Sequence, residues 1–242
     1  MNSNSRDRQK RMNQASGLVR LYRSVIRKVR QRSLDPNSRY WDLRYETGGD
    51  SGLGSFGKLA EYKARFLNRF VAEHAVRSVL ELGCGDGNQL ALYAFPEYVG
   101  LDISPTAIAI CRDRFRDDRT KRFEEYKSRR GFCLDRNLSA QLTISIDVIF
   151  HLTDDEIFFT YLWELFSASR DYVIVYASNC EGPAPASHVR HRRFADDVAA
   201  RFPAWELVHV EQNPYPFEGD SASGSFSDFH VFRLRGPTGG AI

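Results

Sequence analysis

The chain has 242 residues, of which 42% are hydrophobic and 13% aromatic, which is enough apolar material for one sizeable core. No apolar run approaches the roughly eighteen residues of a membrane-spanning helix, and the polar N-terminal stretch lacks the apolar centre of a signal peptide. The four cysteines stand apart, without a Cys-x-x-Cys pair, at Cys84, Cys111, Cys133 and Cys180. This scatter argues against a disulfide or zinc framework. We therefore expect a cytoplasmic protein without a transmembrane segment.

The charge is distributed unevenly along the chain. Residues 1–33 carry ten Lys or Arg and one acid, a net +9, so the other residues carry −6 of the total of +3. Apolar side chains recur in this basic arm at helical spacing, at Leu18, Tyr22, Val25, Ile26 and Val29. The pattern predicts an amphipathic basic helix. This helix could contact a membrane surface, an RNA, another subunit or the body of its own domain, and the sequence does not decide among them.

Residues 34–57 have the composition of a connector. Turn-forming residues stand at 35–38, and five glycines lie between Gly48 and Gly57. The aromatic residues beside them favour a lid that closes over a ligand, and an inert linker is the alternative. We therefore expect two parts, a basic helical arm with a glycine-rich lid over residues 1–57 and a catalytic domain over residues 58–242.

Strands and helices alternate in the rest of the chain. After a helix over residues 58–73, short apolar strands are separated by amphipathic helices, which predicts an α/β fold with a parallel sheet covered on both faces. Two final strands have no room for a crossover helix between them, so they should pair antiparallel. The expected strands are Ser78–Leu82, Tyr98–Leu101, Leu142–Ile146, Tyr172–Ala177, Trp205–Glu211 and Ser227–Leu234, and the expected helices are Pro105–Arg116 and Asp154–Ser169.

A glycine-dense turn follows the first of these strands. Such a turn, leading into a helix, lets the backbone approach a ligand and offers N–H groups to an anion at the carboxyl edge of the sheet. The dinucleotide fingerprint Gly-x-Gly-x-x-Gly fails here, because Asn88 stands where a frame from Gly83 needs its third glycine. The segment reads instead Glu-x-Gly-x-Gly-x-Gly, beginning at Glu81.

A second acid, Asp102, ends the next strand in the segment Gly-Leu-Asp-Ile-Ser. A carboxylate at this place can accept hydrogen bonds from both hydroxyls of a ribose. The alternative is that Asp102 caps the helix that begins near Pro105.

The glycine loop, the second acid and the terminal strand pair together resemble class I S-adenosylmethionine-dependent methyltransferases, over about residues 75–235. The resemblance implies a Rossmann-like, doubly wound, mostly parallel seven-stranded sheet, here with a helical N-terminal extension. It also implies S-adenosylmethionine as the methyl donor, with Asp102 on the ribose and the next residue against the adenine. The expected cofactor-binding residues are Glu81, Gly83, Gly85, Gly87, Asp102 and Ile103.

The expected strand Leu142–Ile146 leads to two candidate catalytic residues. Asp147 stands at its carboxyl end and His151 about one helical turn later, so both can face the same crevice. Histidine can take the proton of an acceptor hydroxyl at neutral pH, and Asp147 can orient it or hold a metal. The alternative is that both shape the pocket around the methionine end of the donor.

The expected strand Tyr172–Ala177 leads to candidate ligands for a metal and for the acceptor. Asn179 and Glu181 could complete an oxygen-rich Mg²⁺ site with Asp147. His188, Arg190 and His191 could bind an anionic or sugar acceptor, or they could simply precede a helix over residues 192–201.

The acceptor class follows from a second resemblance. The Asn/Asp-Pro-Pro-aromatic motif of adenine and amide nitrogen methyltransferases is absent after the expected strand Leu142–Ile146. The segments 40–45, 54–57, 85–90 and 188–194 resemble bacterial methyltransferases of cell-surface and storage polysaccharide clusters. This resemblance implies O-methylation of a saccharide hydroxyl, such as a methylated mannoside in polysaccharide biosynthesis, in some members with magnesium. Three alternatives stay open: an RNA methyltransferase that uses the basic arm, a small-molecule methyltransferase acting on phenols or amines, and a non-catalytic donor-binding module. The sequence leaves a homo-oligomer open.

Overall fold

The computed structural model describes residues 36–183, 186 and 188–236. The described residues from Asn37 onward belong to one compact unit. The basic helix that we expect within residues 1–33 lies outside the described residues, so its helical form stays a prediction.

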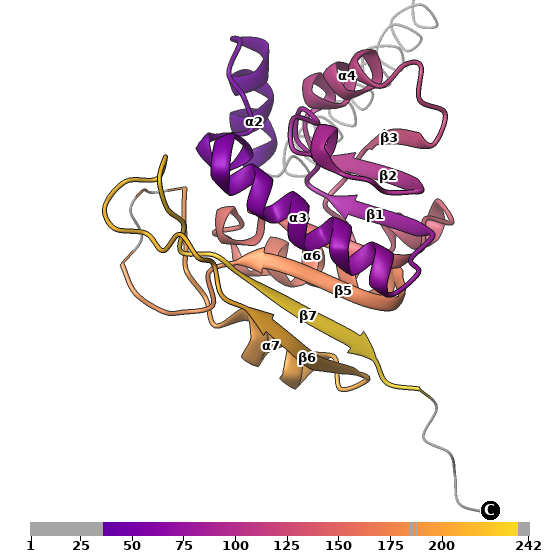
Figure 1. The fold of residues 1–242 in the computed structure, drawn as a ribbon, viewed down its shortest axis with the longest axis vertical. Coiled ribbons are helices and arrows are strands. Elements are labelled where there is room, and N and C mark those ends of the chain that lie inside the picture. The colour runs from indigo at the N-terminus through magenta and orange to yellow at the C-terminus, as the bar shows by residue number, and fades with distance from the viewer. Residues whose placement is uncertain (1–35, 184–185, 187, 237–242) are drawn as a thin grey trace, which may run out of the picture. The chain divides into compact units, whose positions relative to one another are not determined.

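Seven strands form the sheet, and their bounds are β1 (Ser78–Leu82), β2 (Glu97–Asp102), β3 (Lys121–Glu125), β4 (Ala140–Ile146), β5 (Ser169–Ala177), β6 (Trp205–Glu211) and β7 (Asp228–Leu234). Their order across the sheet is β3-β2-β1-β4-β5-β7-β6. The neighbours from β3 to β5 are parallel, whereas β7 runs antiparallel to both β5 and β6 (Figure 1). This arrangement confirms the predicted fold class and the antiparallel terminal pair.

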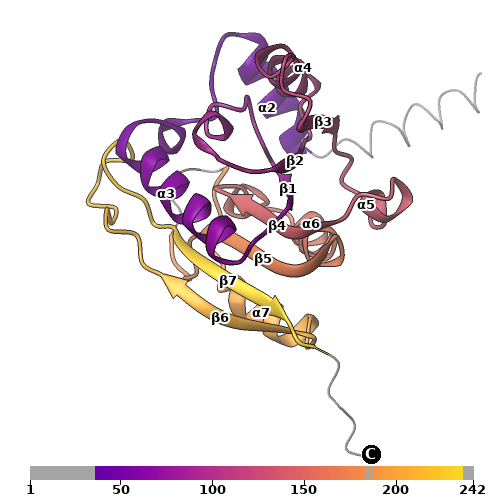
Figure 2. The ribbon, with the colours of Figure 1, turned by 45° about the vertical axis from the view of Figure 1, so that its right-hand side comes forward.

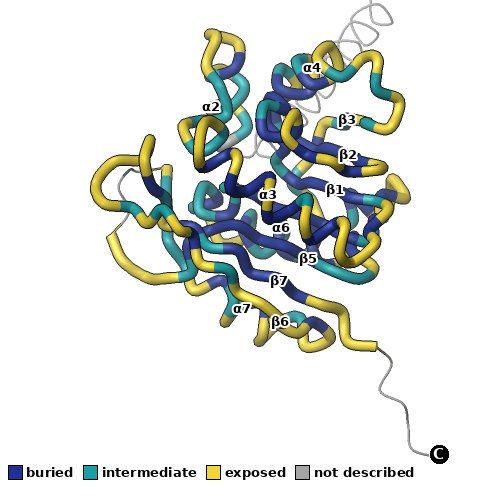
Figure 3. Tube along the Cα trace, in the orientation of Figure 1, coloured by how far each residue is buried: buried dark blue, intermediate teal, exposed yellow. Residues whose placement is uncertain are grey.

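Helices cover both faces of the sheet, as the near-continuous apolar strands predict. On one face lie α3 (Gly57–Glu73) and α4 (Pro105–Arg114), and on the other lie α5 (Phe132–Asp135), α6 (Asp155–Ser167) and α7 (Phe194–Arg201) (Figures 1 and 2). Between the sheet and the helices on each face lies a hydrophobic core of buried residues. The central strands, which lie between these two cores, are dark blue and therefore buried in Figure 3. None of the helices in the described part of the chain is long and apolar enough to cross a membrane.

Local sequence explains where the long helices begin. Ser104 precedes Pro105, which suits the first helical position, and its hydroxyl accepts a hydrogen bond from Ala107 N at 3.1 Å. Asp154 caps α6 in the same way, accepting from Ile157 N at 3.0 Å. On α3, apolar residues recur every three or four positions, so one face of this helix is buried against the sheet.

The strand order reverses between β1 and β4, which are neighbours although β2 and β3 intervene in the chain. At such a switch point the connections leave the sheet on opposite sides, and a crevice opens at the carboxyl ends of the strands. The glycine loop after β1, the acid at the end of β2 and the segment after β4 all meet there. The topology therefore brings together the candidate residues that lie far apart in the sequence.

The expected connector over residues 34–57 is wrong in its first part, because α2 (Pro36–Glu46) is a helix. A carboxylate on this helix, Asp42, accepts hydrogen bonds from Ser104 Oγ at 2.6 Å and from Thr106 N at 3.1 Å. Contact with the start of α4 therefore stabilises a helix whose own pattern is weakly amphipathic. The glycine-rich part that follows is irregular apart from the short 3₁₀ turn η1 (Leu53–Ser55).

Candidate active site

The glycine loop after β1 is held in left-handed backbone conformations. Gly83, Gly85 and Gly87 have φ angles of +86°, +57° and +74°. A Cβ atom on Gly83 would come within 2.4 Å of Val148 Cγ2, so both the backbone conformation and the space demand glycine there. The predicted loop therefore has the form that a close ligand approach needs.

Asp102 lies under this loop and ties it to the next strand. Its Oδ2 accepts a hydrogen bond from Gly85 N at 2.9 Å, and its Oδ1 accepts one from Ser104 N at 2.9 Å. Burial raises the pKa of Asp102 to about 6, and the hydrogen bonds from Ser104 and Gly85 oppose the rise. Ser104 is the cap of α4, so the capping alternative for Asp102 does not hold. Two carboxylate oxygens offer about four acceptor positions, which leaves capacity for ribose hydroxyls.

Glu81 is buried below the loop instead of lining its surface. It accepts a hydrogen bond from Tyr98 Oη at 2.5 Å. Burial raises the pKa of Glu81 to about 7, while the Tyr98 hydrogen bond and the charge of Lys63 lower it. The structure thus places Glu81 as a support of the loop, whereas Ile103 lies partly exposed directly after Asp102.

The segment 37–56 packs on the glycine loop from above. Ser51 Oγ donates a hydrogen bond to Asp86 Oδ1 at 2.8 Å and accepts one from Asp86 N at 3.1 Å. Tyr45 Oη lies 3.0 Å from Ser51 Oγ, and both would crowd a side chain on Gly85. These contacts hold the segment, called the lid segment below, against the glycine loop, and its closure over a ligand stays a prediction.

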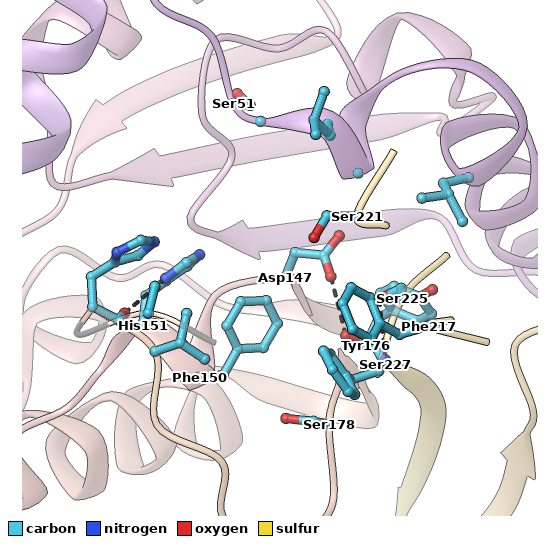
Figure 4. Close-up of a pocket in the computed structure, with 18 of the residues that line it drawn as sticks. Ser51, Asp147, Phe150, His151, Tyr176, Ser178, Phe217, Ser221, Ser225 and Ser227 are labelled. Atoms are coloured by element: carbon cyan, nitrogen blue, oxygen red, sulfur yellow. Dashed lines mark hydrogen bonds between the residues drawn. The ribbon is translucent and has the colours of Figure 1, made fainter. Parts of the chain in front are cut away.

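A cavity of about 490 Å³ opens at Ser51, whose hydroxyl contacts Asp86 of the glycine loop (Figure 4). This volume lies within the range of small-molecule sites. Its walls come from α2, the lid segment, α3, the ends of β4 and β5, and the segment before β7. Five serines line it, Ser51, Ser178, Ser221, Ser225 and Ser227, together with the aromatic residues Tyr40, Trp41, Phe150, Tyr176, Phe217 and Phe226.

Both predicted catalytic residues line this cavity. His151 Nδ1 lies 3.1 Å from the carbonyl oxygen of His188. Because a carbonyl only accepts, Nδ1 must carry the hydrogen, which leaves Nε2 as a free acceptor. Burial lowers the pKa of His151, so the imidazole is neutral at pH 7. Trp41 packs edge-on against this ring, with ring centroids 5.1 Å apart, and fixes its orientation.

Asp147 has a different partner from the one that we expect. Its Oδ2 lies 2.6 Å from Lys63 Nζ, and its Oδ1 accepts a hydrogen bond from Ser227 Oγ at 3.3 Å. Lys63 belongs to α3 and its side chain is only 1% exposed. The sequence analysis missed this lysine, although Leu59 and Leu67, four residues to either side, mark its position as part of the buried face of the helix.

Of the expected acceptor-binding residues, His188 and His191 line the cavity and Arg190 does not. The guanidinium of Arg190 forms an ion pair with Asp155 at 2.9 Å and donates to Thr153 O at 2.9 Å. Arg190 therefore holds the segment after β5 against α6, and its expected role in acceptor binding stays a prediction.

The expected magnesium ligands do not fit a metal. Asp147 is paired with the Lys63 ammonium, and Asn179 Oδ1 accepts a hydrogen bond from Ala195 N at 3.1 Å, at the start of α7. Glu181 is exposed and does not line the cavity. In the part of the chain that the structure describes, no group of three or more His, Cys, Asp or Glu is placed to hold a metal ion.

Comparison with known proteins agrees with this geometry. Residues 80–167 match a family described as a methyltransferase domain, and no curated protein matches the chain. The fold is similar to the methyltransferase domain of bacterial CtHen1-C, with a TM-score of 0.55 and 23% identity over 73% of this chain and 98% of that one. It is also similar to magnesium protoporphyrin IX methyltransferase (ChlM) from Synechocystis PCC 6803 with bound SAH, with a TM-score of 0.55 and 13% identity over 87% of this chain and 100% of that one. Small RNA methyltransferase HEN1 gives a TM-score of 0.55 and 16% identity over 74% of this chain and 26% of that one.

The mostly parallel sheet with its antiparallel terminal pair is the fold of the similar methyltransferase structures, and the glycine loop and the buried acid at the end of β2 lie at its carboxyl edge. With the domain match, the chain is an S-adenosylmethionine-dependent methyltransferase, and S-adenosylmethionine is its methyl donor.

Proposed function

We propose that the protein transfers the methyl group of S-adenosylmethionine to a hydroxyl of a saccharide, with the serine-lined cavity as the acceptor site. The observation that carries the proposal is the lining of that cavity. Serine hydroxyls both donate and accept hydrogen bonds, so a serine-rich lining suits a ligand with hydroxyls even though Ser51, Ser178 and Ser227 also bind protein groups. Aromatic rings such as Tyr40 and Trp41 supply flat apolar surface for the C–H faces of a sugar ring.

The chemistry needs a base as well as a binding site. The donor supplies a methyl group on a sulfonium, and an alcohol becomes a good nucleophile as its proton leaves. The acceptor oxygen forms a bond to the methyl carbon while the carbon–sulfur bond breaks, and His151 Nε2 takes the hydroxyl proton. His151 is suited to this role because its Nδ1 is occupied by the His188 carbonyl and its imidazole is neutral.

The relation of donor to acceptor follows from the sheet. The loop after β1, Asp102 after β2 and Asp147 after β4 share one edge, so a donor on the glycine loop presents its methyl group toward the segment after β4. The expected donor contacts remain a proposal: Asp102 accepts from the ribose, and Ile103 packs against the adenine. Holding both substrates in line is a large part of catalysis, since orientation can contribute roughly 7–11 kcal/mol.

An RNA acceptor is the second candidate. Residues 1–33 carry a net +9, and one of the similar structures is named as a small RNA methyltransferase. Binding that depends on phosphate contacts weakens steeply with salt. Removal of residues 1–33 should then abolish RNA methylation, whereas methylation of a saccharide in the cavity should survive the deletion.

The test is transfer of radiolabelled methyl from S-adenosylmethionine to a panel of oligosaccharides and to bulk RNA. We expect label on a saccharide, and a loss of at least about 100-fold in kcat for His151→Ala with donor affinity unchanged. His209→Ala is the matched control, because His209 lies exposed on β6 and pairs with Glu211 away from the cavity. Label on RNA alone, or equal turnover by His151→Ala and His209→Ala, would refute the proposal.

A further inference from the structure

The cavity wall holds one fully buried cation that the proposed chemistry has not used. Lys63 reaches from α3 to the end of β4, where its Nζ lies 2.6 Å from Asp147 Oδ2. The same Nζ lies 5.3 Å from the centre of the Tyr176 ring, so an aromatic face covers part of its charge. A lysine with 1% of its side chain exposed is rare unless it is paired, and here the pair lines a functional cavity.

Asp147 is fixed from several directions. Its φ angle is +58°, a left-handed conformation that non-glycine residues seldom adopt and that costs about 1–2 kcal/mol. Its backbone N–H donates to Tyr176 O at 2.9 Å. Gly54 lies against the pair, because a Cβ atom on this residue would be 3.1 Å from Asp147 Oδ2 and 3.7 Å from Lys63 Nζ. The surroundings therefore maintain an unfavourable backbone in order to keep this carboxylate at the cavity.

The ion pair with Lys63 leaves the Asp147 carboxylate able to accept a further hydrogen bond. Oδ2 faces the ammonium, whereas among the residues that the structure describes Oδ1 has only the 3.3 Å hydrogen bond from Ser227 (Figure 4). The Asp147 side chain is 26% exposed and lines the cavity. A carboxylate can accept about four hydrogen bonds, so Oδ1 can accept one more from a ligand hydroxyl. The ammonium also acts beyond its direct partner, since its charge lowers the pKa of Glu81.

We infer that Lys63 is a positioning residue that supplies the fixed cation of the acceptor site. Through the ion pair it orients Asp147 so that Oδ1 accepts a hydrogen bond from the acceptor hydroxyl, beside the base His151. The ammonium occupies the Oδ2 side of Asp147, where a metal bridging both carboxylate oxygens would have to lie, so we infer methyl transfer without a metal at this carboxylate. This inference rests on the proposed saccharide O-methyltransferase activity.

The electrostatics favour the lysine over a metal at this place. A divalent ion that shared the Asp147 carboxylate would lie within a few ångströms of an ammonium, and like charges at such distances repel strongly in a partly buried site. Asn179, the other expected ligand, already accepts from Ala195 N. Lys63 therefore neutralises Asp147 from inside the protein, and the carboxylate keeps its free oxygen for the substrate.

The test compares Lys63→Met, which keeps the apolar stem and removes the charge, with Lys63→Arg, which keeps the charge. Lys58→Met is the control on the same helix, because Lys58 is exposed. With the saccharide that the wild type labels, we expect Lys63→Met to lower kcat/KM for the acceptor at least 10-fold, with donor affinity by calorimetry within about 3-fold. Lys63→Arg should recover part of the loss, and Lys58→Met should match the wild type.

Two further measurements separate positioning from structure. In an Asp147→Asn background, Lys63→Met should have little added effect on kcat/KM, because the lysine acts through that carboxylate. The wild-type enzyme should keep full activity in a chelator. Equal kcat/KM for Lys63→Met and the wild type, additive losses in the double variant, or activity that a chelator removes and Mg²⁺ restores would each overturn the inference. Absence of label on any saccharide with the wild type refutes the proposed function itself, which is a distinct outcome.

Discussion

Substitution of Gly85 by alanine tests how the lid segment and the glycine loop fit together. Gly85 has a φ angle of +57°, and an added Cβ would lie 2.3 Å from Ser51 Oγ and 3.0 Å from Tyr45 Oη. The left-handed conformation costs alanine about 1–2 kcal/mol. Displacement of Ser51 also removes its two hydrogen bonds with Asp86, each worth about 0.5–1.5 kcal/mol. Reduced freedom of the unfolded chain offsets about 0.4–1 kcal/mol, so we expect a net loss of about 1.5–4 kcal/mol.

Gly48 offers a matched control for this prediction. Its φ angle is +82°, and a Cβ atom there would meet nothing within 4 Å, so Gly48→Ala carries the conformational cost alone. The assay is urea denaturation of both variants, with calorimetry of S-adenosylmethionine binding. Gly85→Ala should lose more stability than Gly48→Ala, and Ser51→Gly should recover part of the difference. If both glycine variants lose the same free energy of unfolding, Ser51 and Tyr45 do not pack against Gly85 as closely as in the structure.

Three further predictions concern the residues around the donor and the base. Donor affinity should fall as the pH drops through about 6, because protonated Asp102 no longer accepts two ribose hydrogen bonds. Asp102→Asn should bind the donor weakly at every pH. If calorimetry shows that the donor affinity of Asp102→Asn also depends on pH, Asp102 is not the cause. The rate of methyl transfer, kcat, should fall only below the ordinary histidine pKa of about 6.5, because burial lowers the pKa of His151 and only the neutral ring accepts a proton. A decline of kcat that already begins at a higher pH would contradict His151 as the base. Asp42→Ala should destabilise the protein by about 1–3 kcal/mol and speed protease cleavage within residues 37–56, because α2 loses its contacts with Ser104 and Thr106; unchanged cleavage would mean that these contacts do not hold the lid segment.

The parts of the fold that the sequence predicted well are those with a simple apolar pattern. The strands β1, β4 and β5 are apolar runs buried on both faces, and the glycine loop and Asp102 follow directly from such runs. Strand β3 escaped prediction because, among its five residues, only Phe123 is buried and the other four are charged. Pairing with β2 at the edge of the sheet makes it a strand, and that contact is not local in the sequence.

The sequence predicted those site residues whose place follows directly from the end of a strand. Asp147 and His151 do line a common cavity, as their position after β4 suggests. Arg190 and Asn179 had the right chemistry in the right segment, but tertiary partners, Asp155 and the start of α7, engage them. Lys63 was missed because a charged residue on a helix is usually assigned to the solvent face, whereas here a carboxylate from another element pairs with it inside the protein.

A crystal structure with bound S-adenosylhomocysteine tests the central claim most directly, that methyl transfer takes place from the glycine loop into the serine-lined cavity. We expect both ribose hydroxyls on the Asp102 carboxylate, and the sulfur atom facing the cavity between Gly83 and Asp147, within reach of an acceptor held beside His151. A product whose ribose contacts another side chain, or whose sulfur faces away from that cavity, would contradict the account.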